Sequence, residues 1–140
     1  MVAKKAATVY IDGASRGNPG PASVGVVFQG PGGTPAKTIS KGIGVATNNT
    51  AEYSALIIAL QEALMSGVKE LDVFTDSELV AKQFSGEYKI KEPSIKLLFL
   101  FVNHLKQGFS RLSVSHVPRE NNKLADKAAN DALDRSEFFL

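Results

Sequence analysis

Short apolar runs rich in valine, separated by clusters of turn residues, fill the first third of the chain and are typical of β-strands. Residues 8–12 form one such run, followed by a dense cluster of turn residues from 13 to 21. Two further strands are predicted at residues 23–29 and 36–46, with a turn at 30–35 between them. Short turns between three consecutive strands favour an antiparallel meander.

The period changes to that of a helix after this meander. A helix is predicted from residue 49 to residue 65, and Gly67 is a suitable C-terminal stop. The apolar middle of a later helix that opens at Pro93 predicts deep burial. The elements expected after Gly67 are a strand at 71–75, a short helix at 77–84 closing at Gly86, a helix at 93–106, a strand at 111–117 and a helix at 122–135.

The resulting order βββαβααβα predicts an α/β fold. We expect one five-stranded mixed sheet, with three antiparallel strands followed by two parallel strands, flanked by helices. The fourth strand follows a helix, so a right-handed crossover should place it parallel to the first. Ligands bind such sheets outside the carboxyl ends of the strands, near a change in strand order. This rule directs attention to Asp12 and Asp76.

Composition restricts the function classes. The chain has 140 residues, a formal charge of +2 and no cysteine, which predicts one domain over residues 8–140 after a short flexible N-terminus at 1–7. The absence of cysteine excludes a disulfide scaffold, a thiolate zinc site and a cysteine nucleophile. The longest apolar run, residues 97–102, is too short to cross a bilayer. We expect a soluble cytoplasmic protein.

Two acidic residues occupy unusual positions in the first half of the chain. Asp12 ends an apolar strand, although an Asx-type turn with Gly13 would also explain it. Glu52 falls in the middle of a helical apolar stripe formed by Ala55, Leu56, Ala59 and Ala63. A capping box with Asn49 as the N-cap is the alternative for Glu52. An unpaired carboxylate in such a stripe is unfavourable, so a compensating partner is expected.

Two more carboxylates complete the set of candidates. Asp76 follows a strand and precedes a helix, where it could simply be an N-cap. Asp126 lies about one turn into the last helix, beside the stripe of Leu124, Ala125, Ala128, Ala129, Ala132 and Leu133, and could instead pair with Lys123 or Lys127. The predicted topology brings all four acids to one edge of the sheet. Oxygen ligands suit Mg²⁺, and two such ions can assist phosphoryl transfer.

Four stretches of the chain resemble type 1 ribonuclease H in order and spacing. They are YIDGASRGNPG at 10–20, TNNTAEY at 47–53, FTDSELV at 74–80 and HVPRENNKLAD at 116–126. The resemblance implies the ribonuclease H-like fold and hydrolysis of the RNA strand of RNA–DNA hybrids, leaving 5′-phosphate and 3′-hydroxyl ends. It also implies the compact form of the family, because residues 86–93 are too few to hold a basic protrusion.

The resemblance also assigns roles to individual residues. Asp12, Glu52, Asp76 and Asp126 match the family's catalytic and metal-binding set, with two Mg²⁺ ions, or Mn²⁺ as a substitute, when substrate is bound. Asp12 would bridge both ions, Glu52 and Asp76 would hold one, and Asp126 the other. His116 matches a mobile-loop histidine that helps proton movement or product departure, a task suited to its near-neutral pKa. The alternative is a half-exposed histidine at a strand end with no role.

The expected substrate contacts come from two loops. Gly13 permits close approach of a nucleic acid. The resemblance implies that Asn18 and Asn48 touch its backbone or sugars and that Thr47 helps to hold a DNA phosphate. Asn48 could equally serve helix capping. Lys89 and Lys91, with Lys82 and Lys96, either contact phosphates or form a solvated face. We expect a monomer with no membrane association and no obligate protein partner.

Other function classes compete with this interpretation. A non-catalytic module that binds hybrids or double-stranded RNA could share the fold, but it would be favoured only if a carboxylate were missing. Integrase-like transferases and exonucleases share the fold as well, yet the Asn-Pro-Gly turn and the His116 loop match the ribonuclease pattern. A phosphate-loop hydrolase is excluded because the chain has no G-x-x-x-x-G-K-[ST] motif.

Overall fold

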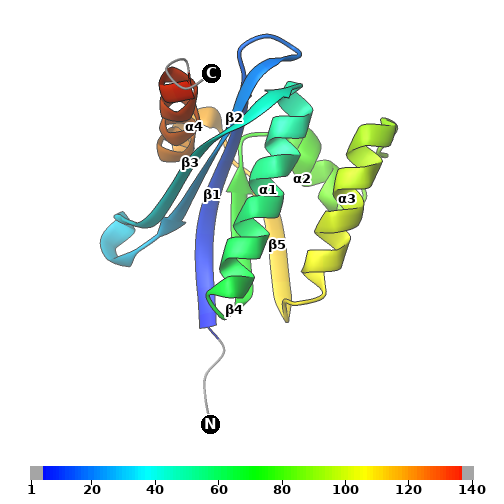
Figure 1. Ribbon diagram of the computed structural model, residues 1–140. Helices are drawn as coiled ribbons and strands as arrows, with labels where there is room; N and C mark the ends of the chain where they lie inside the picture. Colours follow the sequence, from blue (N-terminus) through cyan, green and yellow to red (C-terminus); the bar gives the residue numbers. More distant parts are fainter. Residues whose placement is uncertain (1–4, 137–140) are drawn as a thin grey trace.

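The computed structural model describes residues 5–136, which build a five-stranded sheet in the order β3-β2-β1-β4-β5 (Figure 1). Along the chain the elements are β1 (Lys5–Ser15), β2 (Gly20–Gln29), the 3-10 turn η1 (Pro31–Gly33), β3 (Pro35–Ala46), α1 (Asn48–Met65), β4 (Val68–Thr75), α2 (Glu78–Ser85), α3 (Pro93–Lys106), β5 (Arg111–His116), the 3-10 turn η2 (Arg119–Asn121) and α4 (Lys123–Ser136).

The strand pairing confirms the predicted fold class. β1 pairs antiparallel with β2, and β2 pairs antiparallel with β3. β1 pairs parallel with β4, and β4 pairs parallel with β5. The parallel register of β1 and β4 sets Ile11 opposite Thr75, the last residue of β4. Asp12 follows Ile11 and Asp76 follows Thr75, so both acids are brought to the same edge of the sheet, as predicted.

The two faces of the central strands are buried by different helices. Val9, Ile11, Val24 and Val26 are buried in a core cluster with residues of α1, while Val27 belongs to a second cluster with alanines of α4. Side chains alternate between the two faces of a strand, so α1 and α4 cover opposite faces, as Figure 1 shows. The central strands are thus covered on both sides.

Helix α4 lies very close to β2. A Cβ atom at Gly25 would come 2.1 Å from the carbonyl oxygen of Ala125, a separation that no side chain can adopt. The missing side chain therefore lets the backbone of α4 approach the strand. The predicted apolar stripe of α4 is buried at Ala125, Ala128, Ala129, Ala132 and Leu133. Leu124 does not belong to it, because it lies half-exposed on the first turn.

The first strand is longer than its pattern indicates. β1 begins at Lys5, so residues 5–7 of the expected flexible start pair with β4, while residues 1–4 lie outside the described residues. β1 also continues to Ser15, which pairs with Ala22. The turn is consequently confined to residues 16–19, and Asp12 lies within a strand. Residues 13–15 were expected to belong to the turn, yet they extend β1 because β2 supplies a pairing partner for each of them.

The predicted deep burial of α3 is wrong. Ile95 and Val102 are buried, but Leu97, Leu100 and Phe101 are 58%, 60% and 46% exposed. The helix packs along α1 by one side, and within residues 5–136 no element covers its other side (Figure 1). The apolar surface of α3 is therefore wider than the part of it that packs against α1.

Two further findings concern the surface of the fold. Residues 86–92 connect α2 to α3 without another element, which agrees with the expected lack of a basic protrusion. Among residues 5–136, no helix is both long and apolar enough to span a bilayer.

The contact at Gly25 leads to a test of how α4 is docked. Gly25→Ala should lower the free energy of unfolding by about 1–3 kcal/mol, the usual cost of overpacking, because the new methyl group must push α4 away from β2. Urea unfolding followed by circular dichroism measures the change. Thr38→Ala, at an exposed position of β3, is the control and should change stability by less than about 0.5 kcal/mol. Equal stability of both variants would contradict the close approach.

Candidate active site

Asp12 lies inside the sheet rather than at a turn. It pairs with Gly25 of β2 and is only 6% exposed. The Asx-turn explanation is therefore wrong, because the strand continues beyond it to Ser15. On its other side β4 has already ended at Thr75, which leaves room for the Asp12 carboxylate beside Asp76.

Glu52 is held by a direct contact between α1 and β1. A Cβ atom at Gly13 would lie 2.2 Å from the backbone of Ala51 and Glu52, so only glycine allows the helix this close. The backbone N–H of Gly13 donates a hydrogen bond to the Glu52 carboxylate. Glu52 is 5% exposed and, as predicted, shares its stripe with buried apolar residues of α1.

The capping explanations for Glu52 and Asp76 are both wrong. The N-cap of α1 is Thr47, whose hydroxyl accepts from the N–H of Thr50, not Asn49. Glu52 is therefore too far along the helix to complete a capping box. The N-cap of α2 is Ser77, whose hydroxyl accepts from the N–H of Val80 at 3.2 Å. Both acids are left free to face the site.

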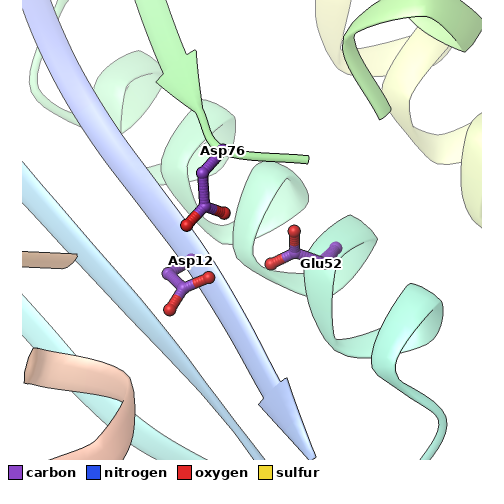
Figure 2. A group of neighbouring side chains, drawn as sticks. All are labelled: Asp12, Glu52 and Asp76. Atoms are coloured by element: carbon purple, nitrogen blue, oxygen red, sulfur yellow. The ribbon is translucent and has the colours of Figure 1, made fainter. Parts of the chain in front are cut away.

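Three carboxylates converge at this edge of the sheet. One oxygen each from Asp12, Glu52 and Asp76 lies within 4.8 Å of the others. Figure 2 shows them coming from β1, from α1 and from the residue after β4, each directed toward the other two. They line a cavity of about 450 Å³.

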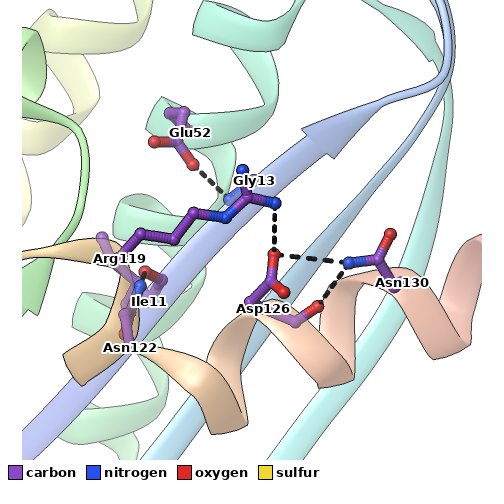
Figure 3. A network of polar contacts seen from close by, with 7 residues as sticks. All are labelled: Ile11, Gly13, Glu52, Arg119, Asn122, Asp126 and Asn130. Atoms are coloured by element: carbon purple, nitrogen blue, oxygen red, sulfur yellow. Dashed lines mark hydrogen bonds and ion pairs between the residues drawn. The ribbon is translucent and has the colours of Figure 1, made fainter.

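Asp126 lines the same cavity from the other side of the sheet, in the first turn of α4. It pairs with neither predicted lysine: Lys127 binds Asp131 instead. The Asp126 carboxylate lies 3.5 Å from an Arg119 nitrogen and accepts a hydrogen bond from the Asn130 amide at 3.3 Å (Figure 3). The structure thus brings all four predicted acids to one cavity, with three in a tight group and Asp126 beside them.

Burial and mutual repulsion disfavour ionisation of the group. Burial, reinforced by the charges of Glu52 and Asp76, raises the pKa of Asp12 to about 9. Burial also raises the pKa of Glu52, although the hydrogen bond from Gly13 opposes this. The pKa of Asp76 is raised by burial and lowered by the nearby Arg119 guanidinium. Without a cation, Asp12 therefore keeps its proton and shares it with Glu52.

A divalent cation fits this donor set. Carboxylate oxygens are the ligands that Mg²⁺ and Mn²⁺ prefer, and a positive charge would offset the burial and the repulsion that raise the pKa of Asp12. Asp12, Glu52 and Asp76 could supply ligands to one ion at the observed spacing. The cavity is lined mainly by polar groups, including Ser77 and Asn48, which suits an anionic substrate brought in with cations.

The remaining predicted site residues lie at varying distances from this cavity. Gly13 and Asn48 line it. Asn18 lies beside the start of α1, where its side-chain oxygen accepts from the N–H of Asn48 at 3.0 Å. With Thr47 these asparagines line an adjoining hollow of about 270 Å³. Asn48 is not the N-cap of α1, because Thr47 occupies that position.

The basic residues and the histidine lie further out. Lys89 and Lys91 line a separate cavity of about 520 Å³ between the start of α1 and the loop after α2. His116 is the exposed last residue of β5, in register with Thr75. It is not among the described residues that line the carboxylate cavity. Lys82 pairs with Glu78 at 3.1 Å, which leaves it less available for a phosphate.

Several residues of the site were missed by the sequence-based prediction. Arg119 and Asn130 line the carboxylate cavity and contact Asp126. Asn122 lies buried under the same cavity edge, bonded to β1. A helical signal existed for Asn130, which follows Asp126 by one helical turn and so shares its face. No periodicity marks Arg119, because it belongs to the 3-10 turn η2.

Comparisons with known proteins agree with the fold. The family described as reverse transcriptase-like matches residues 10–132. Ribonuclease HI of Halobacterium salinarum is 47% identical over 126 residues, covering 89% of this chain and 63% of that protein. A bifunctional protein of Mycobacterium tuberculosis is 44% identical over 127 residues, covering 90% of this chain and 35% of that protein. The chain therefore spans less than two thirds of both curated relatives.

A solved structure matches the chain over nearly the full length of both. The crystal structure of LC11-RNase H1 in complex with an RNA/DNA hybrid superposes with a TM-score of 0.88 at 42% identity, covering 93% of this chain and 98% of that chain. Fold and site thus define a domain of the reverse transcriptase-like class. Within that class, the chain belongs to the type 1 ribonuclease H family.

The raised pKa of Asp12 gives a pH-dependent effect on stability. Below its ordinary pKa of 3.8 the carboxyl is protonated in both folded and unfolded chains and costs nothing; between there and about 9 only the unfolded chain loses the proton. The metal-free protein should therefore lose stability as pH rises. Asp12→Asn removes this penalty, and in EDTA at pH 8 it should raise the free energy of unfolding by more than about 1.4 kcal/mol, the value of one pKa unit.

Urea unfolding at pH 4, 6 and 8 measures the effect, and the gain should shrink toward pH 4. Asp72→Asn is the matched control, because the hydrogen bond from Arg111 lowers the pKa of Asp72. That variant should not gain stability. A pH-independent difference between wild type and Asp12→Asn would contradict the raised pKa.

Proposed function

We propose that the protein is an endoribonuclease that hydrolyses the RNA strand of RNA–DNA hybrids and leaves 5′-phosphate and 3′-hydroxyl ends. The observation that carries the proposal is the convergence of Asp12, Glu52 and Asp76 within 4.8 Å, with Asp126 on the same cavity, in a chain of the ribonuclease H family. The match to LC11-RNase H1 in complex with an RNA/DNA hybrid supports the choice of substrate.

Two Mg²⁺ ions, replaceable by Mn²⁺, are proposed as cofactors in the substrate complex. Asp12, Glu52 and Asp76 would hold one ion, and Asp12 with Asp126 would hold the second. When bound, such ions supply activation of the attacking water and stabilisation of the leaving oxygen. The chain has no cysteine, and no nucleophilic side chain is required for this reaction.

The protein's own residues prepare the site for these ions. The N–H of Gly13 holds the Glu52 carboxylate in a fixed direction, so little rotational freedom is lost when a ligand arrives. Asp12 would be ionised as a ligand when a cation is bound, because the positive charge favours the carboxylate form. Asn130 and Arg119 restrain Asp126 from two directions. Rigid positioning of reacting groups is worth several orders of magnitude in rate.

Recognition of the hybrid is proposed to begin at the start of α1. A hybrid presents 2′-hydroxyls and phosphates across a wide, shallow minor groove, which short polar groups and exposed backbone can read. Asn18, Thr47 and Asn48 line a polar hollow that adjoins the carboxylate cavity, whereas Gly13 is buried against α1 and serves the packing of that helix. Lys89 and Lys91 lie along the next cavity, where they would meet phosphates outside the cleavage site.

The proposal is tested by cleavage of end-labelled RNA annealed to DNA, with Mg²⁺, Mn²⁺ or EDTA. The wild type should cut the hybrid's RNA strand in a metal-dependent manner and leave single-stranded RNA intact. Asp12→Asn should reduce cutting to background, whereas Asp72→Asn, an equivalent change on β4 away from the site, should retain full activity. Enzymatic analysis of the ends should find 5′-phosphates.

A folded wild type that binds the hybrid but cuts nothing in either metal would overturn the proposal. That result would favour the non-catalytic binding module on the same fold. Cutting that persists in Asp12→Asn would place the reaction at other residues.

His116 is proposed to assist proton movement or product departure from the end of β5. Its distance from the carboxylate group fits an auxiliary role, so His116→Ala should lower kcat by on the order of 10- to 100-fold without abolishing cleavage. His104→Ala, an exposed histidine of α3, is the control and should be neutral. Steady-state kinetics on the hybrid at pH 6 to 9 measures both, and identical kinetics for the two variants would remove His116 from the mechanism.

A further inference from the structure

Asn122 is a buried polar residue that the proposed reaction does not use. It lies between η2 and α4 and is 1% exposed. Its amide nitrogen donates to the backbone carbonyl of Ile11 at 2.8 Å (Figure 3). Its amide oxygen has no hydrogen-bond partner within the described residues. Such unpaired buried atoms are uncommon and call for an explanation.

The contacts of Asn122 join two of the segments that carry the acids. Ile11 directly precedes Asp12, so the amide is bonded to β1 next to that acid. Its backbone carbonyl accepts from the N–H of Asp126 at 3.1 Å. One residue thus connects the segments that bear Asp12 and Asp126.

A purely structural role explains this arrangement poorly. The amide makes one backbone bond and leaves its oxygen unpaired, so the gain from the bond is offset by the cost of burying an unpaired polar atom. Its one donor bond, in contrast, has a specific direction. It fixes where the first turn of α4 begins relative to β1.

We infer that Asn122 is a positioning residue, which sets the separation between Asp126 on α4 and the Asp12–Asp76 pair at the sheet edge. The inference rests on the proposed function, because a fixed separation matters only if both sides hold cations around one phosphate. Asp126 lies outside the group within 4.8 Å, so its place depends on how α4 is fastened. Asn122 lies one helical turn before it and supplies that fastening.

The test uses Asn122→Leu, which keeps the volume and removes the donor, and Asn122→Ala as a second variant. Asn121→Ala is the matched control, since Asn121 is its exposed neighbour in η2. Thermal unfolding, Mn²⁺ binding by calorimetry without substrate, and steady-state cleavage of the hybrid are measured on each. For Asn122→Leu we expect a folded protein whose melting temperature is lower by several degrees, because the Ile11 carbonyl loses its donor. We also expect weaker Mn²⁺ binding, and kcat lower by about 10- to 100-fold with little change in KM.

A double variant locates the effect. If Asn122 acts through Asp126, adding Asn122→Leu to Asp126→Asn should cost little more activity than Asp126→Asn alone. Fully additive losses, or unchanged Mn²⁺ binding and kcat in Asn122→Leu, would overturn the inference. Unfolding of both Asn122 variants would overturn it too, because the residue would then be structural. Failure of the proposed function is recognised separately, since the wild type would then cut nothing while the calorimetric comparison could still be made.

Discussion

The backbone of α1 rests directly on β1 at Gly13, and the arrangement of the acids depends on this contact. A side chain there would collide with Ala51 and Glu52 at 2.2 Å. With glycine, the strand's own N–H reaches the Glu52 carboxylate and fixes it next to Asp12. The same docking packs α1 over Val9, Ile11, Val24 and Val26. Core packing and placement of the acids are therefore consequences of one close approach.

The site is unfavourable for the folded chain by itself. Burial raises the pKa of Asp12, Glu52 and Asp76, so the group repels itself at neutral pH when no cation is present. Helices on both faces of the central strands oppose this: α1 covers one face and α4, seated at Gly25, covers the other. Surrounding structure that holds groups in unfavourable positions is typical of functional sites. The strain is electrostatic, and a bound cation would relieve it.

Much of the fold and part of the site followed from residue patterns. The element order, the parallel pairing of β1 with β4 and the burial of Glu52 were all predicted correctly, because hydrophobic period and crossover handedness are local or nearly local rules. The site outside the acids was harder to predict. Asn122 and Arg119 come from an irregular turn without a period, and the exposure of Leu97, Leu100 and Phe101 depends on what packs against α3.

The capping explanations for Glu52 and Asp76 show what the local sequence cannot predict. Asp76 before a helix and Glu52 near a helix start both look like capping residues in sequence, yet Thr47 and Ser77 are the caps. Several side chains near a helix start can offer an oxygen to the first free N–H groups, and the backbone path decides which one does so.

The sequence by itself determined the types and order of the elements, and its four stretches that resemble type 1 ribonuclease H named Asp12, Glu52, Asp76 and Asp126 as one set. Those properties depend on side-chain period and on the order of residues along the chain. Only the tertiary structure decided that Asp12, Glu52 and Asp76 form a tight group while Asp126 lies apart, fastened through Asn122. Distances of a few ångströms between segments far apart in the chain depend on packing at Gly13 and Gly25, which no local pattern records.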